Sequence, residues 1–296
     1  MPQNPSPVSI RDHMVSLAAD GRPFFETVSA LGVAAIELQV DPEFMTPHVR
    51  RPDGSPVSLR NSDDVAAFQE VLTDQGVHIS ALLLMTDFSA EGADDHVRWA
   101  AATVRLARDL SAPAVRIDPL TRNKELSSDK VRENFVRRVK QVLDATADTG
   151  VDLGIENHGP IGNDPAFLDA VFAAVNDPRL GMTLDTGNFY WWGVPLDELY
   201  SLIARYAPRT KHTHIKNINY PPELAHMRRP VGLDYGKYCC PLDEGNIDLS
   251  RIVRTLRDAG YRRDFCIENE SLNKYPADQR LEILRRDVNA VTQALE

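Results

Sequence analysis

The stretch that decides the fold is LGIENHGP, residues 153–160, in which an apolar run ends at Glu156 and then breaks at a Gly-Pro pair. A short apolar run of this kind is typical of a buried strand. Three later stretches have the same form: MTLDTGN (182–188) with Asp185, THIKN (213–217) with His214, and FCIENES (265–271) with Glu268. Buried carboxylates are costly unless they are paired or bind a cation. The four strand ends therefore suggest one shared ion.

Eight strand-then-helix units in a row predict an α/β fold, a single (β/α)8 TIM barrel. The expected strands are 13–19, 34–40, 78–85, 112–118, 151–157, 180–185, 210–216 and 265–270. The intervals from Glu156 to Asp185 and from Asp185 to His214 are both 29 residues, close to the roughly 31 per unit of a barrel of about 250 residues. A doubly wound open sheet is the main alternative.

The domain is expected to span residues 1–296 without a linker. Its clearest helix has Phe135, Val139, Val142 and Leu143 on one face. A long polar loop is expected through Pro47, Pro52 and Pro56, and a second long loop, without periodicity, at about 217–248.

The composition excludes several classes of protein. The chain has 33 Lys and Arg against 43 Asp and Glu, a net charge of −10, which disfavours nucleic acid and anionic membranes as partners. Three cysteines in no CxxC spacing indicate a reduced protein, which we expect to be cytoplasmic. The sequence contains no apolar run of 18 residues, so it predicts no membrane span. A homodimer is the base-rate expectation.

In a barrel the carboxyl ends of all strands point to one face, so the four charged strand ends are expected to converge. Three carboxylates and one imidazole suit one divalent metal ion, Mn²⁺ first, with Mg²⁺, Co²⁺ or Zn²⁺ as alternatives. Taken singly, a carboxylate at a strand end is more often a helix cap or a surface ion pair. His212 is expected on the opposite face of its strand from His214, as a packing histidine or one that supports a metal ligand.

The motifs IENHG, LDTGN, HTHIKN, PLDEGNIDL and FCIENES together resemble those of the xylose isomerase-like barrels, in particular the sugar phosphate isomerase/epimerase group that includes tagatose 3-epimerase-like enzymes. The resemblance implies that Glu156, Asp185, His214 and Glu268 bind the metal, and that Glu156 and Glu268 are also the catalytic acid/base groups. The implied substrate is a small carbohydrate, a ketose or related polyol, and the implied reaction is proton transfer through an enediolate that the metal holds.

Six further residues are expected to bind the substrate. His158 follows the first glutamate, Asn188 lies three residues past Asp185, and Lys216 shares a strand face with His214. Trp191 offers an aromatic face to a sugar, and Arg228 in the long loop offers a cation. Glu244 lies in a loop that resembles the family's GEG turn, although Asp243 replaces its first glycine.

Three alternative functions stay open. A lyase of the same fold, like inosose dehydratase or the enzymes that cleave 3-keto C-glycosides, would begin with the same proton abstraction and then expel a β-substituent. An apurinic endonuclease would need further histidines, one of them where this chain has Asn188. A non-catalytic sugar-binding barrel would have no need of both glutamates.

Overall fold

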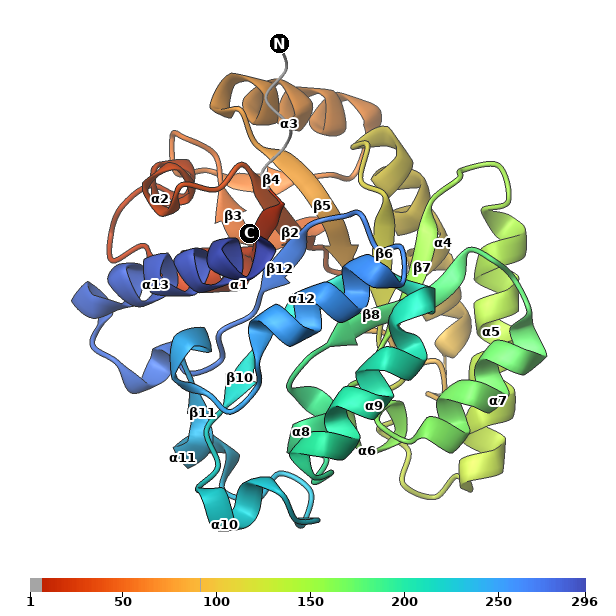
Figure 1. The fold of residues 1–296 in the computed structure, drawn as a ribbon. Helices are drawn as coiled ribbons and strands as arrows, with labels where there is room; N and C mark the ends of the chain where they lie inside the picture. Colours follow the sequence, from red (N-terminus) through yellow and green to blue (C-terminus); the bar gives the residue numbers. More distant parts are fainter. Residues whose placement is uncertain (1–6, 91) are drawn as a thin grey trace.

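The computed structural model describes residues 7–90 and 92–296, so residues 1–6 and 91 of the expected domain lie outside the described part (Figure 1). Eight parallel strands form a closed barrel, which confirms the predicted (β/α)8 fold. Around the barrel they are β1 (Val8–Arg11), β2 (Ala35–Gln39), β5 (His78–Leu83), β6 (Ala114–Ile117), β7 (Asp152–Glu156), β8 (Leu180–Asp185), β9 (Thr210–Ile215) and β12 (Phe265–Ile267), which pairs again with β1.

Helices surround the barrel (Figure 1). The longer ones are α1 (Asp12–Ala18), α2 (Phe24–Leu31), α3 (Ser62–Gln75), α4 (Ala93–Asp109), α5 (Ser128–Ala145), α7 (Pro165–Val175), α9 (Leu196–Tyr206), α12 (Leu249–Asp258) and α13 (Ala277–Leu295). Single turns follow β7 and β8 as α6 (Gly159–Gly162) and α8 (Asn188–Trp191), and 3-10 turns lie at η1 (Ala207–Arg209) and η3 (Leu272–Lys274).

Helix α5 forms as its sequence predicts. Ser127 caps it by accepting a hydrogen bond from the Lys130 backbone N–H at 3.3 Å. The predicted apolar face, with Phe135 and Val139 among its members, is buried. Each such side chain contributes about 1.5–3 kcal/mol when it is fully buried, so packing against the barrel, rather than helix propensity, holds α5 in place.

The expectation for the first strand is wrong. Residues 13–19, predicted as a strand, lie mostly in helix α1, and the strand is the shorter segment Val8–Arg11 before it. Met14, Val15 and Ala18 are buried at helical spacing, while Val8 and Ile10 are buried in the barrel. A four-residue strand gives too little alternation to be separated from the apolar helix that follows it.

The segment through Pro47, Pro52 and Pro56 also differs from the expected loop. It contains a two-stranded antiparallel hairpin, β3 (Met45–Arg50) and β4 (Pro56–Ser58), which lies outside the barrel sheet. The chain turns between them at Pro-Asp-Gly, where Gly54 has a φ of 82° that favours glycine. This turn signal predicts a hairpin better than the three prolines predict a loop.

The long segment between β9 and α12 agrees with the predicted position, about 217–248, but it has structure of its own. Strands β10 (Asn217–Ile218) and β11 (Cys239–Cys240) pair antiparallel, and between them lie the short helices α10 (Pro222–Ala225) and α11 (Tyr235–Tyr238). The 3-10 turn η2 (Leu242–Glu244) follows. Elements of only two to four residues leave no periodicity to recognise in the sequence.

Candidate metal centre

Four buried side chains meet where adjacent barrel strands end. Glu156 ends β7, Asp185 ends β8, His214 is near the end of β9 and Glu268 follows β12. These strands are consecutive neighbours in the barrel, and the potential ligand atoms of all four residues lie within 4.8 Å of one another. None of the four residues is more than 2% exposed. The convergence expected from the strand spacing is therefore what the barrel produces.

Three atoms in this cluster have no hydrogen-bond partner within the described part of the chain: Asp185 Oδ2, His214 Nδ1 and Glu268 Oε2. His214 Nδ1 lies 3.3 Å from Glu268 Oε2 and 3.5 Å from Glu156 Oε2. A buried polar atom without a hydrogen bond is costly, and a cation placed among these atoms would satisfy all three. Carboxylate oxygens and an imidazole nitrogen are donors that divalent metals accept. The residues therefore fit a divalent cation.

Each carboxylate of the cluster also contacts a cationic side chain. Arg116 pairs with Glu156, Arg11 pairs with Glu268, and Lys216 Nζ lies 3.1 Å from Asp185 Oδ2. These pairs lower the cost of burying three carboxylates together. Lys216 Nζ also lies 3.0 Å from Glu268 Oε2, so it connects two of the four residues.

The cations give the carboxyl groups different acidities. Burial raises the pKa of Glu156, but Arg116 and His214 outweigh it and hold that pKa well below its usual range. Lys216, His214 and Arg11 do the same for Glu268. Burial raises the pKa of Asp185 to about 7, and the two neighbouring glutamates contribute to this rise against the effect of Lys216. Both glutamates are therefore ionised at neutral pH. Asp185 is partly protonated there, and a bound cation would displace its proton.

Burial disfavours the charged form of His214, but three surrounding carboxylates, Glu37 first, raise its pKa well above the usual value. Without a metal ion the imidazole therefore carries a proton at neutral pH. A metal ligand needs a free lone pair on its coordinating nitrogen, so cation binding at Nδ1 would release that proton.

Two of the expected substrate contacts lie inside the cluster. Asn188 Nδ2 donates to Glu156 Oε1 at 3.0 Å, and its backbone N–H donates to Asp185 Oδ1 at 2.8 Å. Lys216 is 3% exposed and reaches Asp185 and Glu268. Both side chains hold the carboxylates in place, whatever contact they make with a substrate.

His158 lies beside the cluster, whereas Trp191 has its contacts with the long segment. His158 Nδ1 is 2.8 Å from Asp118 Oδ2, and 37% of its side chain is exposed. It lines a cavity of about 170 Å³ with residues of the loop after β6. Trp191 is partly buried against the long segment, whose Gly232 donates its backbone N–H to the Trp191 carbonyl at 2.9 Å.

Arg228 and Glu244 have their contacts elsewhere. Arg228 is exposed and pairs with Glu198 of helix α9 at 2.6 Å. Glu244 pairs with Arg286 of helix α13 at 2.7 Å. The structure does not bring either residue into contact with the four candidate ligands, because surface partners on the outer helices hold both side chains.

The strand face expected for His212 is wrong. Residues two apart in a strand share a face, and the rings of His212 and His214 lie 5.7 Å apart, both beside Glu37. His212 is 1% exposed and lies in the barrel interior.

Five polar residues around the cluster were not predicted: Arg11, Glu37, Arg116, Asp118 and Glu270. A signal existed for some of them, since Arg116 interrupts the apolar run APAVRID and Glu37 interrupts AAIELQV. Arg11 was hidden by the wrong placement of the first strand.

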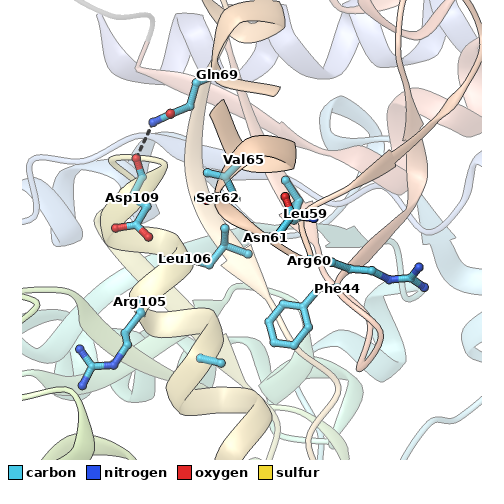
Figure 2. A pocket seen from close by; sticks show the side chains of 11 residues that line it. Phe44, Leu59, Arg60, Asn61, Ser62, Val65, Gln69, Arg105, Leu106 and Asp109 are labelled. Atoms are coloured by element: carbon cyan, nitrogen blue, oxygen red, sulfur yellow. Dashed lines mark hydrogen bonds between the residues drawn. The ribbon is translucent and has the colours of Figure 1, made fainter. Parts of the chain in front are cut away.

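A larger cavity, of about 570 Å³, lies away from the strand ends (Figure 2). Helices α3 and α4 line it together with Phe44, Leu59 and Arg60 beside the β3–β4 hairpin. Its one lining carboxylate, Asp109, pairs with Arg108 at 2.8 Å, and Gln69 Nε2 donates to the Asp109 carbonyl at 2.6 Å (Figure 2). The described residues that line it include no histidine or cysteine. No group of candidate metal ligands therefore lies among the described residues of this cavity.

The protein is a closed (β/α)8 barrel, and its strand ends carry a cluster of side chains that fits a divalent cation. Residues 25–289 match the xylose isomerase-like TIM barrel family, and the chain belongs to that family. Among curated relatives it is similar to an inosose dehydratase of Klebsiella pneumoniae subsp. pneumoniae, with 26% identity over 129 residues. That match covers 42% of this chain and 42% of the relative, so it spans less than half the length of either protein.

Two solved structures resemble the whole chain. One is the IOLI protein with a binding zinc atom, with a TM-score of 0.70, 16% identity, and coverage of 97% of this chain and 98% of that chain. The other is a D-tagatose 3-epimerase-like protein, with a TM-score of 0.66, 17% identity, and coverage of 98% and 99%. At these identities the likeness establishes the fold. Among the helices of the described part, none is both long and apolar enough to cross a membrane.

Proposed function

We propose that this protein is a divalent-metal-dependent enzyme that acts on a keto-sugar or keto-polyol and begins by removing a proton from the carbon beside the carbonyl. One observation carries the proposal. Four buried residues with metal-ligand side chains meet within 4.8 Å at the strand ends, and two of them are glutamates whose pKa values are held well below the usual range.

Glu156, Asp185, His214 and Glu268 would hold the ion, which would polarise a ketone oxygen and an adjacent hydroxyl and stabilise negative charge on them. The cluster offers only carboxylates and one imidazole, which leaves Mn²⁺, Mg²⁺, Co²⁺ and Zn²⁺ as candidates.

The two glutamates supply the bases. Glu156 ends β7 and Glu268 follows β12, and β8 and β9 lie between those two strands, so we expect the two carboxylates to reach a bound substrate from different directions. Asn188 holds one carboxylate and Arg11 holds the other. A base must be ionised and fixed before it takes a proton, and both glutamates meet these conditions.

A dehydratase-type lyase is the outcome that we favour. After the α-proton is removed, loss of a hydroxyl from the β-carbon requires a proton donor. His158 fits this role, because Asp118 holds its Nδ1 and the side chain is partly exposed. Burial lowers the pKa of His158, but Asp118 and Glu156 outweigh it and raise that pKa, which keeps a proton on the ring. The similarity to an inosose dehydratase supports the same outcome.

An isomerase or epimerase is the second candidate, and the placement of the glutamates favours it. Epimerisation needs one group to remove a proton and another to return it to the opposite face of the same carbon. Glu156 and Glu268 are both available for this, and the fold resembles that of a D-tagatose 3-epimerase-like protein.

Proton NMR in D₂O separates these outcomes with an inosose and a ketohexose such as tagatose as substrates. For a lyase we expect a dehydrated product, whereas an epimerase gives deuterium at the reacting carbon of a product that keeps all its hydroxyls. Glu268→Gln should lower the rate by about 10²–10⁴-fold, and the matched surface variant Glu198→Gln should not change it. An unchanged rate in Glu268→Gln, or full activity after chelation of metal, would refute the proposal.

A further inference from the structure

A second buried group of polar side chains lies directly beside the four candidate ligands. It consists of Glu37, His212, His214 and Cys266, and its potential ligand atoms lie within 4.8 Å of one another. Glu37, at 0% exposure on β2, is the acidic member. His214 belongs to both groups, so a hydrogen bond at one of its ring nitrogens affects which nitrogen carries the proton.

The two ring nitrogens of His214 face different partners. Nε2 lies 2.9 Å from Glu37 Oε1 and 3.0 Å from Glu37 Oε2, whereas Nδ1 faces the carboxylates of Glu156 and Glu268. Carboxylates flank both nitrogens, but only Nε2 lies within 3.0 Å of its partner, whereas Nδ1 is 3.3 Å or more from Glu268 and Glu156. An ionised carboxylate only accepts hydrogen bonds, so when a cation takes the lone pair of Nδ1, the remaining ring proton resides on Nε2 and is donated to Glu37.

We propose that Glu37 is a positioning residue for the metal centre: it accepts the Nε2–H of His214, fixes the ring and its tautomer, and so presents Nδ1 to the cation. This inference rests on the metal-binding part of the proposed function. Carboxylate partners of metal-ligating histidines recur in proteins, and their loss costs about 10–100-fold in metal affinity. Here the partner comes from β2, on the far side of β1 and β12 from His214 in the order of the barrel strands.

The same four residues could instead be read as a second metal site. That reading requires His214 to coordinate ions through both nitrogens, which means losing both ring protons. Glu37 also already lies at hydrogen-bond distance from His214 Nε2, and 3.2 Å from His212 Nε2. The geometry points to a hydrogen-bonded support rather than a second ion.

The test measures Co²⁺ binding to the full chain after metal has been removed with a chelator. We expect the wild type to bind one Co²⁺ ion, and Glu37→Leu, which has no acceptor, to bind it about 10–100-fold more weakly. Glu37→Gln keeps a neutral acceptor, which forms a weaker hydrogen bond than a carboxylate, so a loss of about 3–10-fold is expected. The NMR spectrum of the Co²⁺-loaded wild type should show one exchangeable, paramagnetically shifted imidazole N–H that disappears in Glu37→Leu.

Cys266→Ala is the matched control, since it belongs to the same buried group but makes no contact with the His214 ring nitrogens at hydrogen-bond distance. It should bind Co²⁺ like the wild type. Circular dichroism of each metal-free variant checks that it is folded. If Glu37→Leu does not fold, the Co²⁺ affinity of Glu37→Gln tests the proposal instead.

Three results distinguish the possible errors. Unchanged affinity and an unchanged N–H signal in the Glu37 variants would overturn the positioning role alone. Two Co²⁺ ions per wild-type chain, reduced to one by Cys266→Ala, would overturn it in favour of a second metal site. A wild type that binds no Co²⁺, Mn²⁺ or Zn²⁺ would instead refute the proposed function on which this inference rests.

Discussion

Strands β7, β8, β9 and β12 carry the four candidate ligands, whereas β1, β2 and β6 carry side chains that pair with those ligands. Arg11, Glu37 and Arg116 from the first half of the barrel each contact a residue from the second half. The first half therefore provides two counter-charges and a hydrogen-bond acceptor, whereas the second half provides the groups proposed to bind the ion together with one counter-charge, Lys216. Variants of the candidate ligands in the second half should lose turnover, whereas variants of their partners in the first half should lose stability or metal affinity.

The largest difference is expected within one ion pair, that of Glu156 and Arg116. Glu156→Gln removes a proposed ligand and base and should lower turnover by about 10²–10⁴-fold, while the protein stays folded because Arg116 keeps Asp118 at 3.0 Å. Steady-state kinetics and circular dichroism measure the two effects. Turnover within a factor of ten of wild type would show that the second half does not carry the chemistry.

Arg116→Met should act on stability instead. It leaves Glu156 and Asp118 buried without their cation, and breaking a buried pair in this way costs about 3–5 kcal/mol. Urea unfolding of the metal-free protein measures the loss. Arg228→Met is the control, since its ion pair with Glu198 is exposed and should contribute less than about 1 kcal/mol. Equal losses in the two variants would show that the buried pairs of Arg116 stabilise the protein no more than an exposed pair does.

Metal affinity should depend on pH through Asp185, whose pKa burial raises to about 7 from an ordinary 3.8. A cation must replace this proton, so Co²⁺ affinity should fall at least about tenfold for each pH unit below 7. In the metal-free protein the same raised pKa contributes stability that is present below pH 3.8 and is lost as pH rises through 7.

Calorimetry in two buffers of different ionisation enthalpy counts the protons released on binding. Asp287 is the control, because burial also raises its pKa to about 7 and it lies outside both clusters. Asp287→Asn should leave the dependence on pH unchanged. An affinity that stays constant between pH 5.5 and 7 would contradict the role of Asp185.

The smallest effect is expected on the outer surface. Arg228→Ala and Glu244→Gln should each leave KM within about twofold of wild type, because both side chains pair with outer helices and surface changes of this kind are worth less than about 0.5 kcal/mol. A tenfold rise in KM for either variant would mean that the long segment moves over the substrate, and would restore the sequence prediction.

Much of this arrangement is predictable from local pattern. The apolar runs that end at Glu156, Asp185 and His214 identify strands, and their equal spacing identifies the barrel. The prediction failed where the elements are short. Strand β1 has four residues, and the segment 217–248 is built from elements of two to four residues, so neither offers enough periodicity to separate one type of structure from another.

The side chains that pair with the candidate ligands could not be predicted from local pattern. Glu37 and His214 are 177 residues apart in the chain, and Arg11 and Glu268 are 257 residues apart. Local periodicity tells which residues end a strand, because backbone geometry repeats every two residues. It does not tell which distant strand lies opposite in the closed barrel, or which charge each buried carboxylate meets there. Those pairings arise only when the sheet closes, since burial then makes an unpaired charge too costly to keep.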